Sequence, residues 1–248
     1  MIKIKQKSLL YYISKRFIDI LGSSFLLIVL SPLFLLVAIL IKLSSKGPVF
    51  YTSKRVGQDY RVFEFIKFRS MRTDADSLLS KMSNINQYGS DENESLVSDN
   101  QIDASSILIS DEGCISEKTW LAMQSREKPF VKIANDPRIT RIGSFIRNTS
   151  IDELPQLVNV LRGDMSLVGN RPLPLYEAEK LTTDKAIERF VAPAGITGLW
   201  QVTERGKAGM SAESRQKLDV KYARRASLLL DLWILVRTPL AVFQTENV

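Results

Sequence analysis

The chain has 248 residues, of which 45% are hydrophobic, and its 34 lysines and arginines outnumber 27 aspartates and glutamates, giving a net charge of +7. A single cysteine excludes an internal disulfide, and the absence of histidine excludes histidine catalysis and histidine metal sites. A metal cofactor would then be a hard ion such as Mg²⁺, held by oxygen ligands.

The first predicted element is an apolar segment. The 22 residues between Asp19 and Lys42 carry no charge, which is enough for a helix to cross a hydrocarbon core of about 30 Å. A cleaved signal peptide is disfavoured, because its apolar region would be shorter and no small-residue cleavage site follows. A buried helix of a soluble protein, apolar on every face, is the alternative.

Charge on both sides of this segment bears on its topology. Basic residues lie before it (Lys3, Lys5, Lys7, Lys15, Arg16) and after it (Lys42, Lys46, Lys54, Arg55). The positive-inside rule places both ends on the cytoplasmic side, which a helix that enters, breaks and returns satisfies. Ser31 and Pro32 lie mid-segment, where the proline interrupts helical bonding and the serine hydroxyl can bond a freed carbonyl. A kinked ordinary span is equally compatible with the residues.

Residues 48–71 alternate apolar and polar side chains around a Gly57-Gln58-Asp59 turn and predict a β-hairpin. Its polar positions include Lys67 and Arg69. If these bases have no functional role, they form the solvated basic face of a strand pair. Residues 73–118 are rich in Ser, Asn and Asp, and predict an acidic insertion that is loosely folded or disordered. The body outside this insertion is therefore strongly basic and suits phosphates, anionic lipid or nucleic acid.

The C-terminal half predicts a series of short elements. These are a basic amphipathic helix over 139–148, an acid-led helix over 150–161, a surface helix over 176–190, a turn over 193–198, an extended piece over 200–202, a helix over 211–225 and an apolar helix over 228–243. The last is short for a membrane span, and is compatible with a core helix or a helix in the membrane interface.

Two adjacent acids, Asp152 and Glu153, begin the acid-led helix. Residues 150–153 fit a capping box, and a helix dipole favours acids in any first turn. However, Arg147, Arg162 and Arg171 lie nearby in the sequence. Acids for a metal or a nucleophile, with arginines for an anion, indicate chemistry on phosphates.

Several ordered motifs carry a family resemblance that covers nearly all of residues 15–240 outside the insertion. They read KRFIDI, LSPLFL, GPVFYTSKRVG, NDPRITRIGSFIR, SIDELPQLVNVLRGDMSLVGNRP and PAGITGLWQV. With these motifs the chain resembles the short form of the bacterial sugar transferases, which are monotopic polyprenyl-phosphate phosphoglycosyl transferases. The resemblance implies transfer of a sugar-1-phosphate from a UDP-sugar to undecaprenyl phosphate, with release of UMP, through a covalent aspartyl intermediate.

The resemblance also implies residue roles. Asp152 would be the nucleophile and Glu153 would hold Mg²⁺, while Arg147 and Arg171 would bind phosphates. Lys67, Arg69 and Asp219 match further family positions near the substrate phosphates. Lys15 and Arg16 would anchor at the lipid headgroups, and Ser31 and Pro32 would form the break of a re-entrant helix, which decides the topology in favour of re-entry.

The chain departs from the family pattern in three places. Asn170 stands where the family often has proline before Arg171, residues 203–205 read Thr-Glu-Arg where many relatives have Asn/Ser-Gly-Arg, and the acidic insertion is longer than in the shortest members. Changes at 203–205 would alter selectivity if that loop touches the nucleotide or the sugar.

Together these observations predict an α+β, mainly helical fold. Residues 1–47 would form a re-entrant membrane element and residues 48–248 a catalytic domain with interfacial amphipathic helices, on the cytoplasmic face of the bacterial inner membrane. Expected partners are a UDP-sugar, undecaprenyl phosphate, membrane lipid and later glycosyltransferases of a surface-polysaccharide pathway. No nucleic-acid-binding module is recognisable. The alternative hypothesis to an enzyme is a membrane-anchored interaction protein with a degenerate transferase site.

Overall fold

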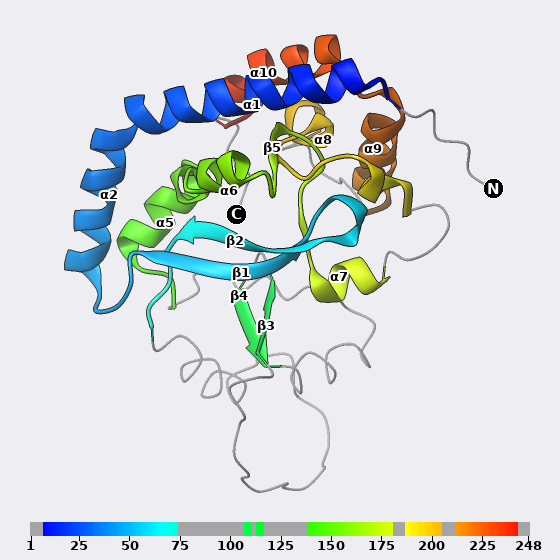
Figure 1. The fold of residues 1–248 in the computed structure, drawn as a ribbon. Coiled ribbons are helices and arrows are strands. Elements are labelled where there is room, and N and C mark those ends of the chain that lie inside the picture. Colours follow the sequence, from blue (N-terminus) through cyan, green and yellow to red (C-terminus); the bar gives the residue numbers. More distant parts are fainter. Residues whose placement is uncertain are drawn as a thin grey trace, which may run out of the picture.

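The computed structural model describes residues 7–73, 107–110, 113–116, 138–180, 187–204 and 212–242. Over these residues the fold is mainly helical with small sheets, as the sequence predicts (Figure 1). Within the predicted insertion, strands β3 (Ile107–Ser110) and β4 (Gly113–Ser116) pair as an antiparallel hairpin. Nearly all of the rest of that insertion lies outside the described residues.

Two helices joined at a sharp break form the N-terminal element. Helix α1 (Leu9–Val29) and helix α2 (Ser31–Ser44) are bent by 60° at Leu30. The Ser31 hydroxyl donates to the Ile28 carbonyl at 2.8 Å, and Ile28 lies four residues before Pro32. The hydroxyl therefore satisfies the carbonyl that the proline leaves without a helical N–H, which confirms the predicted break. No single described helix has the length and hydropathy of a membrane span, whereas the bent pair meets both criteria together.

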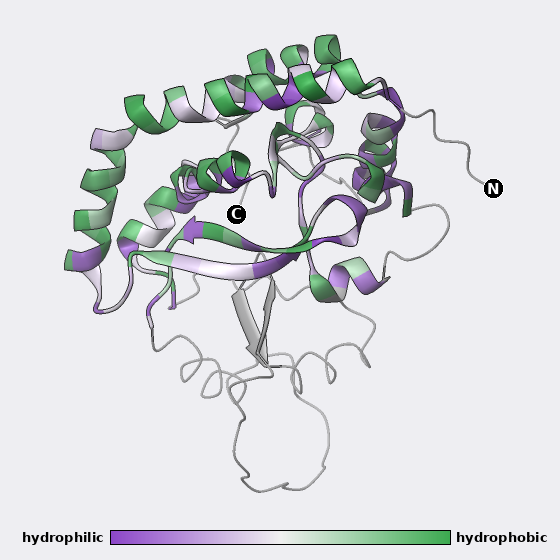
Figure 2. Cartoon of the chain, viewed as in Figure 1, coloured by the Kyte–Doolittle hydropathy of each residue, from purple (hydrophilic) through white to green (hydrophobic). Residues whose placement is uncertain are grey.

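The two faces of α1 reverse the usual pattern of a surface helix. Its buried residues are Lys15, Asp19 and Ser23, spaced by four and hence on one face. Large apolar side chains are exposed instead along α1, α2 and α10 (Leu228–Val242), among them Leu9, Leu10, Phe17, Phe25, Ile28, Leu35, Leu43, Leu229, Val236 and Leu240. Figure 2 shows this apolar character along the three helices. An apolar outer face is what a lipid environment requires and water disfavours.

The predicted hairpin is confirmed. Strands β1 (Phe50–Val56) and β2 (Val62–Phe68) pair antiparallel from Phe50↔Phe68 to Val56↔Val62. A short 3₁₀ turn, η1 (Gln58–Tyr60), connects them, with φ near 52° at Asp59 and 58° at Tyr60. Strand β6 (Leu173–Pro174) pairs with the other edge of β1, so that the order is β2-β1-β6. The sheet thereby brings the chain after Arg171 close to the hairpin.

The remaining elements pack beneath α1 (Figure 1). They are α5 (Arg141–Asn148), η4 (Ile151–Glu153), α6 (Gln156–Arg162), β5 (Ser166–Val168), α7 (Leu175–Lys180), η5 (Ile187–Val191), β7 (Gly195–Thr197), α8 (Leu199–Thr203) and α9 (Ala212–Arg225). Strands β5 and β7 form a second, parallel pair, with Ser166 opposite Gly195 and Val168 opposite Thr197. The predicted helices over 139–148, 211–225 and 228–243 are confirmed as α5, α9 and α10.

Three local predictions were wrong or incomplete. Residues 193–198, predicted as a turn, contain strand β7, which depends on a partner about thirty residues earlier in the chain. Residues 200–202, predicted as extended, belong to helix α8, where Trp200 is 4% exposed and burial overrides local preference. The predicted helix over 176–190 is α7 followed by η5, with residues 181–186 outside the described residues.

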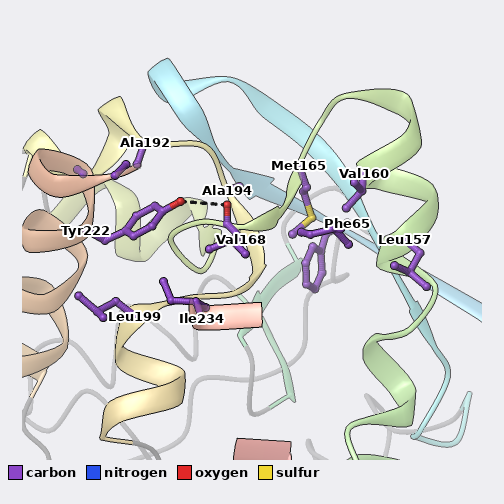
Figure 3. Close-up of a cluster of buried hydrophobic side chains, with 13 residues drawn as sticks. Phe65, Leu157, Val160, Met165, Val168, Ala192, Ala194, Leu199, Tyr222 and Ile234 are labelled. Atoms are coloured by element: carbon purple, nitrogen blue, oxygen red, sulfur yellow. Dashed lines mark hydrogen bonds between the residues drawn. The ribbon is translucent and has the colours of Figure 1, made fainter. Parts of the chain in front are cut away.

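A single main core joins the hairpin to the helices. It holds Phe65 of β2, Leu157 and Val160 of α6, Val168 of β5, Tyr222 of α9 and Ile234 of α10, together with Met165, Leu167, Ala192, Ala194, Leu199, Ala223 and Ala226. Within it the Tyr222 hydroxyl donates to the Val168 carbonyl at 3.3 Å (Figure 3). A second cluster packs Val37 and Ile41 of α2 against Phe68 and Ile146. The bent helix pair is thus packed on the end of β2 and on α5, the elements that flank the acid pair.

Candidate active site

The acid pair lies on a tight turn between α5 and α6. Ser150 has φ 56° and ψ 17°, a left-handed conformation, and makes no side-chain capping bond to η4. The predicted capping box is therefore wrong, because an N-cap side chain needs an extended backbone to reach the helical N–H groups. The acid-led helix is likewise split into η4 and α6. The turn leaves Asp152 buried and Glu153 partly buried among basic side chains.

Two cations from distant segments meet on Glu153. Arg171, in the loop between β5 and β6, donates from Nη2 to Oε1 at 2.8 Å and from Nη1 to Oε2 at 3.4 Å. Lys67, near the end of β2, donates from Nζ to the same Oε1 at 3.0 Å. The three side chains are between 16% and 19% exposed, so their interactions are only partly screened by water.

Asp152 sits beside this cluster with weaker contacts. Its Oδ2 lies 3.7 Å from Lys67 Nζ, and the residue is 7% exposed. Burial raises the pKa of Asp152 to about 6, opposed by the charge of Lys67 and reinforced by the neighbouring Glu153. Burial also acts to raise the pKa of Glu153, but the charges of Arg171 and Lys67 outweigh it and hold that pKa well below its usual range. The first proton taken up by this pair therefore goes to Asp152.

A third basic residue, Arg147 of α5, acts electrostatically on Asp152. Its Nε donates to the Ser70 hydroxyl at 2.8 Å, and its charge lowers the pKa of Asp152. The structure thus gathers five of the predicted site residues in one place: Lys67, Arg147, Asp152, Glu153 and Arg171. Three fixed cations around two carboxylates form a site with surplus positive charge, suited to an anionic substrate.

Two residues predicted to bind phosphate lie elsewhere. Arg69 donates to the carbonyls of Ser45 and Lys46 at 2.7 and 3.0 Å and so fastens the end of α2. Asp219 is 1% exposed and accepts from Arg189 at 2.6 Å, which leaves its carboxylate no exposure to a substrate.

Lys15 and Arg16, which were predicted to anchor at the lipid headgroups, also face the protein. Lys15 is 6% exposed and donates to Asp231 Oδ2 at 2.8 Å and to the Val168 carbonyl at 2.9 Å. Arg16 donates to the carbonyls of Val160 and Leu161 at the end of α6, where a helix favours a cation. In this arrangement both side chains fasten α1 to the body of the protein.

Sequence reasoning missed the residues that support the site from behind. The Asn159 amide donates to the Glu64 carbonyl at 2.7 Å and accepts from Ile66 N–H at 3.1 Å, so it fixes the edge of the strand that carries Lys67. In the sequence, such a role is indicated by a polar residue at a helix position that the helical repeat places in the core. Nothing in the sequence indicated this role for Arg189, which lies behind Arg171. A surface helix was predicted there, and an arginine is ordinary at any exposed position of such a helix.

The donor set accommodates Mg²⁺ only together with a substrate. Among the described residues, no group of three or more acidic or cysteine side chains is arranged to hold a metal ion. Asp152 and Glu153 are adjacent oxygen donors, and Mg²⁺ characteristically takes one or two carboxylates and completes its shell with substrate phosphates and water. The pair therefore has the donor type that Mg²⁺ takes, with substrate phosphate and water left to complete the shell.

A separate cavity of about 440 Å³ lies beneath α1 and beside the hairpin turn, lined by Tyr12, Asp19, Arg61, Phe63, Asp164 and their neighbours. None of the five gathered site residues lines it. Its polar groups are mixed in sign, and Lys15, Arg16 and Asp19 at its wall already bond protein atoms. We therefore place the chemistry at the acid–base cluster of Lys67, Arg147, Asp152, Glu153 and Arg171, because of its residue types and charges.

The acid–base cluster has the residue types of a phosphate-handling enzyme, and comparison with known proteins specifies the family. The model of the family "Bacterial sugar transferase" matches residues 10–245, and the chain belongs to that family of phosphoglycosyl transferases. It is 35% identical over 229 residues to the exopolysaccharide production protein ExoY of Rhizobium meliloti, covering 92% of this chain and 85% of the relative.

Two other relatives carry names that state a reaction. The undecaprenyl-phosphate galactose phosphotransferase of Salmonella typhimurium is 36% identical over 234 residues, which is 94% of this chain and 41% of that protein. The undecaprenyl-phosphate glucose phosphotransferase of Komagataeibacter xylinus is 37% identical over 234 residues, which is 91% of this chain and 35% of that protein. This chain thus matches well under half the length of these two larger relatives.

Proposed function

We propose that this protein transfers a sugar-1-phosphate from a UDP-sugar to undecaprenyl phosphate and releases UMP, as the first step of a surface polysaccharide or glycoconjugate. The observation that carries the proposal is the cluster of Asp152 and Glu153 with Lys67 and Arg171, at 2.8 to 3.7 Å. Relatives named as undecaprenyl-phosphate galactose and glucose phosphotransferases support it. The product lipid would then be used by later glycosyltransferases.

In the proposed first step, an Asp152 carboxylate oxygen attacks the sugar-linked phosphorus of the UDP-sugar. A new oxygen–phosphorus bond forms, the bond to the bridging oxygen breaks, and UMP leaves with that oxygen. In the second step a phosphate oxygen of undecaprenyl phosphate attacks the same phosphorus and releases the Asp152 carboxylate. Without histidine in the chain, a carboxylate is the natural nucleophile for a phosphoryl group.

The bases and Glu153 would prepare the donor for this attack. Lys67, Arg147 and Arg171 neutralise the diphosphate and hold its phosphorus near Asp152, which is the main task of a phosphoryl-transfer site. Glu153, which stays ionised, would hold Mg²⁺ together with the diphosphate. The ion, when bound, neutralises negative charge that develops on the phosphate oxygens.

The decisive experiment measures UMP release by the full-length protein in lipid nanodiscs, with undecaprenyl phosphate and a panel of UDP-sugars. At least one sugar is expected to give turnover that needs the lipid acceptor and falls on chelation of divalent ions. Without acceptor, a burst of UMP no larger than the enzyme concentration should accompany a mass gain of one sugar-phosphate on the peptide that contains Asp152. Lipid binding without turnover on any sugar would overturn the proposal and favour the interaction protein.

We further propose that α1 and α2 enter the inner membrane and return, leaving the catalytic region on the cytoplasmic face. The reversed polarity of α1, the exposed apolar faces of α1, α2 and α10 and the 60° break support this arrangement. In a Cys114→Ser background, thiol variants Lys5→Cys and Phe50→Cys should both resist an impermeant reagent added outside intact cells. Labelling at one position alone would indicate an ordinary span.

A further inference from the structure

A buried ion pair lies behind the turn that carries Arg171. Arg189 of η5 is 3% exposed and Asp219 of α9 is 1% exposed. The arginine donates to Asp219 Oδ2 from Nη2 at 2.6 Å and from Nε at 3.2 Å. A desolvated pair held by two donors keeps one geometry, because breaking it would leave a charge in the protein interior.

The same arginine reaches the site through the main chain. Arg189 Nη2 also donates to the backbone carbonyl of Arg171 at 3.1 Å, and the guanidinium of Arg171 donates in turn to Glu153 at 2.8 Å. A continuous series of hydrogen bonds therefore runs from α9 to the acid pair.

A chain-specific residue strengthens this series. Asn170 is 4% exposed, and its side-chain amide donates to the carbonyls of Arg189 at 2.8 Å and Asp219 at 3.1 Å. The resemblance described above often places proline at this position, and a proline side chain has no donor. Here two amide hydrogen bonds hold the turn onto η5 and α9 where the ring of a proline would stiffen it.

We propose that Asn170, Arg189 and Asp219 are positioning residues that hold the backbone of the Arg171 turn so that its guanidinium meets Glu153 and the incoming diphosphate. The substrate in this statement rests on the proposed function. Arg171 is a long side chain that acts at its tip, so a shift of its backbone carries directly into the site. Misplacement of a binding group by about 1 Å costs on the order of a hundredfold in rate.

A purely structural role for the pair is the competing explanation, and the chain offers a matched control. Glu188 and Arg224 pair at 2.7 Å and join the same two elements, one residue earlier in η5. Among the described hydrogen bonds, those of the Glu188 carboxylate go to Arg224. Glu188→Gln therefore weakens an ion pair between η5 and α9 while it leaves the hydrogen bonds of Arg189, Asp219 and Asn170 to the Arg171 turn in place.

The test is a double-mutant cycle in the full-length protein in nanodiscs. Asp219→Asn, Arg189→Lys and Asn170→Ala are each made alone and with Arg171→Lys, and kcat/KM for the UDP-sugar is measured with the melting temperature. Asp219→Asn should lower kcat/KM about 10- to 100-fold alone, but less than about threefold beside Arg171→Lys, because coupled residues are not additive. Glu188→Gln should lower the melting temperature with kcat/KM unchanged.

Arg189→Lys protects the test against misfolding, since the ammonium can still pair with Asp219 while losing the fork that also reaches the Arg171 carbonyl. It should reproduce the non-additive loss of kcat/KM at a near-normal melting temperature. Losses that add fully to that of Arg171→Lys would overturn the positioning role.

Binding of inorganic pyrophosphate, measured by calorimetry, separates this inference from the proposed function. If the parent protein binds pyrophosphate but releases UMP from no UDP-sugar, the proposed function fails while the same cycle in Kd still decides the positioning role. Non-additive changes in Kd would support it, and additive ones would overturn it.

Discussion

The ionic groups of the acid–base cluster and those behind it are arranged in opposite ways. In the cluster, Glu153 is shared by Lys67 and Arg171, while Asp152 has Lys67 no closer than 3.7 Å. Behind it, Arg189 and Asp219 pair one to one, with side chains only 3% and 2% exposed. The cluster has more positive charge than its two acids balance, whereas the rear pair is neutral overall.

This contrast separates a reactive arrangement from a supporting one. A neutral, desolvated pair has no charge to offer a ligand, but removal of one partner strands the other in the interior. A partly exposed cluster with surplus cations costs less free energy to break. Its cations can give up a carboxylate partner and bind a phosphate instead. Substitutions in the cluster should therefore change the rate with little loss of stability. Substitutions in the rear pair should change stability as well, and should change the rate only through the Arg171 turn.

The largest expected effect comes from Asp152→Asn. The amide cannot attack phosphorus, so UMP release should fall by about a thousandfold or more. The pKa of Asp152 is raised by burial, so its charged form destabilises the fold as the pH rises from about 4 through about 6. Asparagine removes that cost, and thermal scans at pH 7 should show a melting temperature higher by a few degrees.

The pH dependence of that comparison is its control. Well below pH 4, under both the raised pKa of Asp152 and the ordinary aspartate pKa, the residue is protonated in the folded and the unfolded states. The two proteins should then melt at similar temperatures. Undiminished turnover in Asp152→Asn would exclude Asp152 as the nucleophile, whatever the melting temperatures.

A second, smaller effect is an acid limb in the rate profile. As the pH falls through about 6, Asp152 takes up a proton, and kcat/KM should drop towards tenfold per pH unit. Lys67→Met removes a charge that lowers the pKa of Asp152, so the limb should move to higher pH. Lys54→Met, on the neighbouring strand, is the matched control and should leave the limb in place. A limb unmoved by Lys67→Met would contradict the assignment.

The features that sequence could predict are those whose causes are local. The alternation of residues 48–71, the proline at 32 and the amphipathic pattern of 139–148 each act within a few residues, and each element forms as expected. Strand β7 and helix α8 were missed, because a three-residue strand exists only through a distant partner and Trp200 is placed by burial.

The same limit explains the outcome at the site. The motif around Asp152 was found from its residue types, yet the roles expected for Lys15 and Asp219 depended on partners that spacing does not reveal. Lys15 pairs with Asp231, 216 residues away, and Asp219 pairs with Arg189, 30 residues away. A lone charge in a motif is ambiguous between contacting a ligand and balancing a distant charge until the partner is known.

A third prediction concerns another buried ion pair that supports the fold, Lys15 with Asp231. Lys15→Met removes the cation beside the buried Asp231 carboxylate, which keeps its hydrogen bonds from the Tyr11 and Tyr222 hydroxyls. The change should cost about 3 kcal/mol, or roughly 10 °C in melting temperature for a chain of this length. Assayed well below melting, kcat/KM should stay within about threefold of the parent protein, since the pair lies outside the acid–base cluster.

The companion variant joins Lys15→Met with Asp231→Asn. Removing both charges should restore most of the lost stability, because no charge is then left unpaired. A double variant as unstable as the single one would show that packing of the lysine stem, rather than the ion pair, stabilises α1 on the body.

The smallest effect is expected at the break between α1 and α2. Ser31→Ala removes the hydroxyl that satisfies the Ile28 carbonyl and should cost about 1 kcal/mol, whereas Ser31→Thr keeps the hydroxyl and should be near neutral. Pro32→Ala acts in the opposite sense, because the new N–H can bond the same carbonyl and continue the helix. If the break is what turns the chain back, the Ser31→Ala/Pro32→Ala double variant should make position 50 accessible to an impermeant thiol reagent in a fraction of molecules. Protection at both position 5 and position 50 in that variant would mean that the packing of α2 on β2 and α5, rather than the proline, sets the return of the chain.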